Sequence, residues 1–167
     1  MARDATARLY DVDANLVVMD KQAGTITFRA RKGRLVDLDK LHESVWATRL
    51  GDGTGMQLQW LEVTAQGEVA AADEEVRLKV SGSEQYFVLG DNDKEGERAP
   101  FRRLKEALAR GEKVVSVTGR VDGWTGNWTQ FLRKLPGKPR RLVVRDFQTA
   151  SAGLFRNSAI GSGSLEA

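Results

Sequence analysis

The chain has 167 residues, 41% of them hydrophobic, so it is long enough for one large domain or two small ones and apolar enough to bury a core. Its 26 basic and 23 acidic residues leave a formal net charge of only +3, which makes whole-molecule charge a weak argument for a nucleic-acid partner. It has no cysteine, which excludes disulfides, thiolate metal sites and cysteine nucleophiles.

Hydropathy and the two ends of the chain bear on its compartment. No run approaches the roughly 20 apolar residues of a membrane span, and the N-terminal MARDATARLY lacks the apolar core of a signal peptide. We therefore expect no membrane partner, and the compartment stays open between the cytoplasm and export with a leader removed. Residues 151–167, rich in Gly, Ser and Ala, predict a flexible tail that ends in a linker and cloning scar, GSGSLEA.

The first part of the chain predicts a β-hairpin followed by a helix. Between residues 10 and 30, two β-rich runs flank a turn at Gly24. The next segment, VDLDKLHESVWATRLG, changes to a helical period and predicts a helix from Asp37 to Gly51. Its apolar face carries Leu38, Leu41 and Val45.

The middle and last parts predict five strands and a second helix. After the break GDGTG, residues 56–69 are typical of a long strand, AAADE of a turn, and EVRLKVSG and EQYFVLG of two more strands. A helix from Pro100 to Gly111 follows, with Phe101, Leu104 and Leu108 on one face. The runs VVSVTGRVDGW and RRLVVRDFQTA complete the pattern as two strands.

This order of three strands, a helix and two strands is the chain order of an OB-fold, a five-stranded Greek-key barrel. The helix would plug one open end of such a barrel, and α+β sandwiches with the same order stay an alternative. We predict an α+β protein with a small hairpin-plus-helix unit over residues 5–55, an OB-like barrel over 56–150 and a flexible tail over 151–167.

Two segments, AGTITFRARKGRLVDLDKLHESV and LQWLEVTAQGEV, resemble the second half of the ferredoxin-like heavy-metal-associated domain. In outline, residues 8–149 also resemble some bacterial proteins that join such a half-domain to an OB-like barrel. Metal-carrying members of the family bind soft metal ions through a Cys-x-x-Cys pair. This chain has no cysteine, so the resemblance implies a scaffold without metal transfer.

Other candidate sites are weak. The acidic stretch DNDKEGE, residues 91–97, matches the first positions of a calcium loop, but Arg102 stands where the bidentate Glu is required. We interpret it as an acidic surface turn, with a weak cation site that uses Glu106 as the alternative. His42, the single histidine, is expected on a helix surface, and no nucleophile elbow or phosphate-loop motif occurs. We predict a non-enzymatic protein without a cofactor or bound metal.

Residues 123–141, GWTGNWTQFLRKLPGKPRR, combine aromatic and basic side chains and are called here the tryptophan-basic segment. In the OB-like order this segment connects the fourth and fifth strands and frames the usual ligand face. Its rings can stack on bases or sugars, and its cations attract phosphate. The predicted ligand-binding residues are Trp124, Trp128, Phe131, Arg133, Lys134, Lys138, Arg140 and Arg141.

Three interpretations of the tryptophan-basic segment remain open. Its tryptophans can close a small satellite core beneath an arm stiffened by Pro136 and Pro139. It can contact a protein or polymeric ligand, including a second copy of the chain, or it can bind single-stranded nucleic acid. We predict a binding or assembly module for a protein or polymeric ligand, with sequence-tolerant binding of single-stranded nucleic acid as the alternative.

Overall fold

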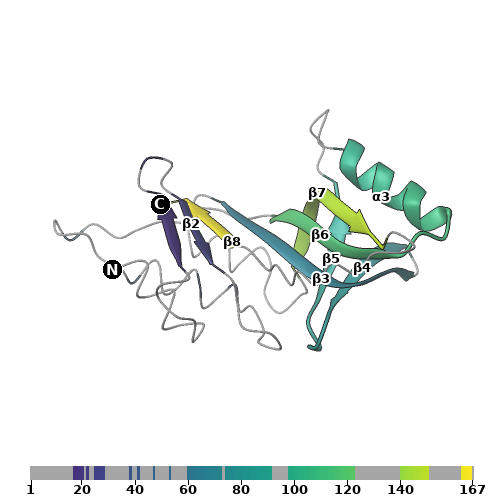
Figure 1. The fold of residues 1–167 in the computed structure, drawn as a ribbon, viewed down its shortest axis with the longest axis horizontal. Coiled ribbons are helices and arrows are strands. Elements are labelled where there is room, and N and C mark those ends of the chain that lie inside the picture. Colours follow the sequence, from purple (N-terminus) through teal and green to yellow (C-terminus); the bar gives the residue numbers. More distant parts are fainter. Residues whose placement is uncertain are drawn as a thin grey trace. The chain divides into compact units, whose positions relative to one another are not determined.

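The computed structural model describes residues 17–20, 22, 25–28, 38, 41, 47, 53, 60–72, 74–91, 98–122, 140–150 and 163–166. The chain divides into two compact units, and Figure 1 labels the strands β2 to β8 and the helix α3. The first unit comprises Met1–Glu62, Gly123–Lys138 and Ser162–Ala167, and the second comprises Val63–Asp122 and Pro139–Gly161.

Three short strands pair antiparallel in the first unit: β1 (Val18–Asp20), β2 (Thr25–Phe28) and β8 (Gly163–Glu166). The amide of Gln22 donates a hydrogen bond to Oδ1 of Asp20 at 2.9 Å, a contact that stabilises the turn between β1 and β2. The hairpin expected near the N-terminus is therefore confirmed. β8 lies inside the stretch expected to form a tail, and the other residues of that stretch lie outside the described ones.

The helix expected from Asp37 to Gly51 is described at three positions. Leu38, Leu41 and Ala47 are helical, and the two leucines, three residues apart, are buried while Ala47 is exposed. This is the sidedness that an amphipathic helix requires. The ferredoxin-like relationship of this unit stays a prediction.

The second unit is built on five strands. They are β3 (Leu61–Ala72, from Val63 onward in this unit), β4 (Glu75–Val80), β5 (Tyr86–Gly90), β6 (Val114–Val121) and β7 (Arg141–Thr149). The β3–β4, β4–β5 and β6–β7 pairs are antiparallel, whereas β5 and β7 are parallel. The parallel pair is possible because the connection from β5 to β7 is long and contains a helix and a strand.

The strand order β3-β4-β5-β7-β6 returns to its start, because β3 also pairs with β6. A hydrogen bond of 2.8 Å between the hydroxyl groups of Thr64 on β3 and Thr118 on β6 lies at this junction. The described part of this unit is thus a mixed five-stranded sheet with a barrel-like closure and one helix, an α+β architecture.

The helix α3 (Ala99–Ala109) lies against β7 and β6 (Figure 1). Pro100 stands in its first turn, where a missing N–H costs no hydrogen bond. Leu104 and Ala107 are buried on its inner side. Gly111 ends the helix with a φ of 76°, and its amide donates to the carbonyl of Leu108 at 2.9 Å. The helix expected from Pro100 to Gly111 is therefore confirmed.

The core of the second unit comes from alternate residues of the strands together with α3, as period-two patterns predict. Its fully buried side chains, each exposed by 2% or less, are Leu78, Phe87, Leu104, Ala107, Val114, Val117, Leu142 and Val144. Burying one leucine or phenylalanine side chain of this kind stabilises a fold by about 1.5–3 kcal/mol.

One turn was placed wrongly from the sequence. The stretch AAADE, residues 70–74, was expected to be a turn, but Ala70, Ala71 and Ala72 belong to β3 and stand opposite Arg77, Val76 and Glu75. Only residues 73 and 74 connect β3 to β4. Alanine has a low intrinsic strand propensity, and here cross-strand pairing with β4 prevails over it.

Candidate functional site

Only two of the predicted ligand-binding residues, Arg140 and Arg141, lie among the described residues. Trp124, Trp128, Phe131, Arg133, Lys134 and Lys138 lie outside them. Arg140 is 9% exposed, and its carbonyl accepts a hydrogen bond of 3.1 Å from the amide of Val88 on β5. Arg140 therefore holds the start of β7 to β5 through its backbone.

Arg141 is surrounded by groups from the ends of two other strands. Its Nη2 donates a hydrogen bond of 2.7 Å to the carbonyl of Asp91, just after β5, and lies 3.7 Å from Oδ1 of the same residue. Its Nη1 lies 3.7 Å from Oδ2 of Asp122, just after β6. The guanidinium group thus bridges Asp91, the first residue of the acidic stretch, and Asp122, which precedes the tryptophan-basic segment.

Gly90 makes room for this arrangement. A Cβ atom at position 90 would collide with Nε, Nη2 and Cζ of Arg141, so the guanidinium group lies directly over the glycine. The sequence predicts Arg141 to attract a ligand phosphate, whereas in the structure its donors face the protein's own oxygen atoms. The same contacts place a cation beside Asp91, the first ligand of the calcium-loop pattern, which disfavours a cation there.

A second group of polar side chains lies on the outer face of β4 and β5. In both strands buried and outward residues alternate, with Leu78 and Phe87 inside and Arg77, Lys79, Tyr86 and Val88 outside. These four outward residues are called here the Tyr86 face. Arg77 stands opposite Val88, and Lys79 stands opposite Tyr86.

Arg77 and Tyr86 are diagonal neighbours across this strand pair. Cζ of Arg77 lies 5.5 Å from the centroid of the Tyr86 ring, within the range of a cation–π interaction. Tyr86 is 38% exposed, one of the few large apolar side chains of the described region that solvent reaches to this extent. The contact with the ring and the ion pair with Glu75 both restrict the Arg77 side chain, so this surface is partly organised before any ligand arrives.

Charges on and around the Tyr86 face are balanced. Nε and Nη2 of Arg77 donate to Oε2 of Glu75 at 3.1 and 2.9 Å, and Nζ of Lys79 donates to Oε2 of Glu84 at 3.3 Å. Exposed pairs of this kind contribute only about 0–1 kcal/mol to stability. Their larger effect here is that each cation has an acidic neighbour, so the face offers little attraction to a polyanion.

Sequence reasoning missed Arg77, Lys79 and Tyr86 as candidate residues, although the signal was present. The strands EVRLKV and YFVLG were both predicted, and their alternation with the apolar residues places these three side chains on the outer face. What the pattern does not contain is the register, which brings Arg77 to the ring of Tyr86.

The described residues form neither a cluster of metal ligands nor a membrane-spanning helix. In the described ranges, no three side chains of His, Asp or Glu gather closely enough to hold a metal ion. Nor does any helix of those ranges combine the length and apolar character needed to cross a membrane.

Comparison of the chain with protein-family models, with curated proteins and with solved structures gave no match.

Proposed function

We propose that the second unit is an OB-fold barrel that acts as a non-enzymatic binding module, with the Tyr86 face as its contact surface for a protein or polymeric ligand. The OB-fold is supported by the pairing of the five strands, by the parallel β5–β7 pair and by a helix between β5 and β6. In this numbering β4 and β5 are the second and third barrel strands, which carry the ligand face of OB-folds.

The observation that carries the proposal is the Arg77–Tyr86 pair on these two strands. Tyrosine and arginine are enriched in the residues that dominate protein–protein binding energy, because they combine large contact area with directed hydrogen bonds. Holding the Arg77 guanidinium over the ring lowers the entropy that each side chain loses when a partner is bound.

The charge balance of the Tyr86 face favours a protein or a neutral polymer over nucleic acid as the ligand. A nucleic-acid site gains much of its affinity from cations that neutralise phosphates. Here Arg77 and Lys79 have Glu75 and Glu84 as neighbours. That the tryptophan-basic segment, residues 123–141, also contacts a ligand stays a separate prediction.

The test uses a peptide library displayed on phage and selected on the whole chain, after which the enriched peptides are measured on the original chain and on the Tyr86→Ala variant. We expect enriched peptides whose affinity falls about tenfold or more in Tyr86→Ala, as for a buried aromatic anchor. Gln148→Ala, which truncates an exposed side chain on β7, serves as the matched control and should leave the affinity unchanged.

Light scattering over a range of protein concentrations, with the same variants, shows whether a second copy of the chain is the partner. Peptides that bind Tyr86→Ala as well as the original chain, or no saturable peptide binding together with a monomeric chain, would contradict the proposal. Saturable binding of oligo-dT that is lost in Tyr86→Ala would assign this face to nucleic acid instead.

A further inference from the structure

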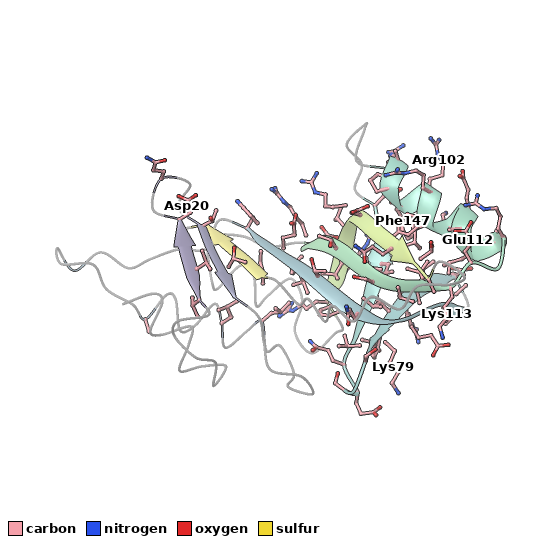
Figure 2. All side chains as sticks on the ribbon, viewed as in Figure 1. Asp20, Lys79, Arg102, Glu112, Lys113 and Phe147 are labelled. Carbon is pink, nitrogen blue, oxygen red and sulfur yellow. The ribbon has the colours of Figure 1, made fainter. Side chains whose placement is uncertain are left out.

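The helix α3 is dense in positive charge. Residues 98–110 contain five basic residues and one acidic residue, Glu106. Leu104 and Ala107 are buried on the inner side of the helix, and three cations, Arg102, Arg103 and Lys105, are exposed. These three exposed cations are called here the α3 basic face. Figure 2 shows Arg102 projecting from α3 away from the strands.

The cations of the α3 basic face differ from those of the Tyr86 face in forming no ion pair with a described residue, although Glu106, exposed on the same helix surface, lowers its net charge from +3 to +2. Within the part of the chain that the structure describes, neither Arg102 nor Arg103 forms an ion pair. The ammonium group of Lys105 lies 5.2 Å from the centroid of the Phe101 ring, a cation–π contact that positions the charge without neutralising it. Arg110, by contrast, is paired with Glu112 at 2.6 Å.

A net positive charge on one helix surface attracts polyanions. We infer that the α3 basic face is a second contact surface, and that it binds the phosphate backbone of nucleic acid without reading its sequence. Two of its three cations are arginines, whose forked donors match phosphate oxygens two at a time. Arg102 and Lys105 are separated by about 4.5 Å along the helix axis, so neighbouring phosphates can be contacted together.

The same residues indicate contact with the phosphate backbone of the nucleic acid and not with its bases. The aromatic ring of this surface, Phe101, is half-buried and has Lys105 over one face, so it is less open to stacking than an exposed ring. Cations that contact phosphates hold the strand in position but do not discriminate between bases.

This inference does not rest on the function proposed for the Tyr86 face. Arg102 on α3 and Lys79 on β4 lie on different sides of the second unit (Figure 2). Each surface can therefore be altered while the other is left intact.

The experiment measures binding of fluorescently labelled oligo-dT to the whole chain by anisotropy, at salt concentrations from about 50 to 200 mM. We expect the affinity to fall steeply with salt. In Arg102→Gln/Arg103→Gln/Lys105→Gln the slope of log K against log salt should become shallower by about 2, because about 0.7 of a counterion is released per contact with a single strand.

Two variants control for charge and position. Arg102→Lys/Arg103→Lys keeps the charge and should keep the slope. Arg77→Gln/Lys79→Gln removes two cations from the Tyr86 face and should leave both affinity and slope unchanged. Should the triple variant prove unstable in thermal unfolding, Arg103→Gln alone reports the same effect as a slope change of about 0.7.

Three results would overturn the inference. The first is no binding of oligo-dT to the original chain at the lowest salt concentration. The second is an equal loss of affinity in the Arg77→Gln/Lys79→Gln control. The third is equal competition by polyglutamate at matched charge, which would assign the surface to acidic polypeptides.

Discussion

The hydroxyl groups of Thr64 and Thr118 lie 2.8 Å apart, although 54 residues separate them in the chain. They join β3 to β6, the pair that closes the five-stranded sheet of the second unit. Removing one hydroxyl leaves the other partly buried without its partner, which is costlier than removing both.

The first prediction follows from this pair. Thr118→Val should lower the free energy of unfolding by about 1 kcal/mol, whereas Thr64→Val/Thr118→Val should cost less than the sum of the two single variants. Urea unfolding with an unchanged m value measures the difference. Strictly additive effects would show that the hydroxyl groups do not interact in solution.

The second prediction compares two glycines. A Cβ at Gly67 would collide with the backbone carbonyl of Lys79, which is fixed by strand pairing, so Gly67→Ala should cost about 3 kcal/mol. The three atoms nearest to a Cβ at Gly90 all belong to the flexible side chain of Arg141, which can shift, so Gly90→Ala should cost about 1 kcal/mol. Denaturation midpoints of the two variants give the order, and the reverse order would contradict it.

The third prediction concerns the bridge made by Arg141. In Arg141→Ala the contacts with Asp91 and Asp122 are already lost, so adding Gly90→Ala should have almost no further effect. A double-mutant cycle in urea measures this coupling. If the two substitutions add independently, the guanidinium group does not lie over Gly90.

The fourth prediction tests whether Arg77 and Tyr86 interact. A cycle with Arg77→Met and Tyr86→Leu should give a coupling free energy of about 0.5–1 kcal/mol, the value for an exposed cation–π pair. Urea is preferred over guanidinium chloride, which would screen the charge. A coupling near zero would remove the argument that this surface is organised in advance.

The fifth prediction separates the two sides of α3. Leu104 is fully buried, so Leu104→Ala should destabilise the protein by about 2–5 kcal/mol. Arg103→Ala, on the exposed side of the same helix, should change stability by less than about 0.5 kcal/mol. If the two substitutions destabilised the protein equally, α3 would not be packed through its apolar side. A small effect of Arg103→Ala also shows that charge variants of this helix can be used in binding experiments.

Much of the local structure could be predicted. The helix from Pro100 onward, the strands EVRLKV and YFVLG and the last two strands all have the period of their observed conformation. The turn at residues 70–74 could not be placed, because three alanines carry no strong preference and their pairing with β4 decided the outcome. The ligand-binding role of most of the tryptophan-basic segment stays a prediction, since residues 123–139 lie outside the described ones.

For the candidate surfaces too, the sequence determined some features and the tertiary structure decided others. Which side chains of β4, β5 and α3 point outward was determined by the sequence alone, because periods of two and 3.6 residues depend only on neighbours in the chain. Which cations are neutralised was decided by the tertiary structure, because Arg141 meets Asp91 and Asp122 only after the strands have paired. The ion pairs of the Tyr86 face are local, because Arg77 and Glu75 are two residues apart and Lys79 and Glu84 are five apart. The bridge made by Arg141 instead depends on distances between atoms that chain order does not contain, so only the folded molecule shows it.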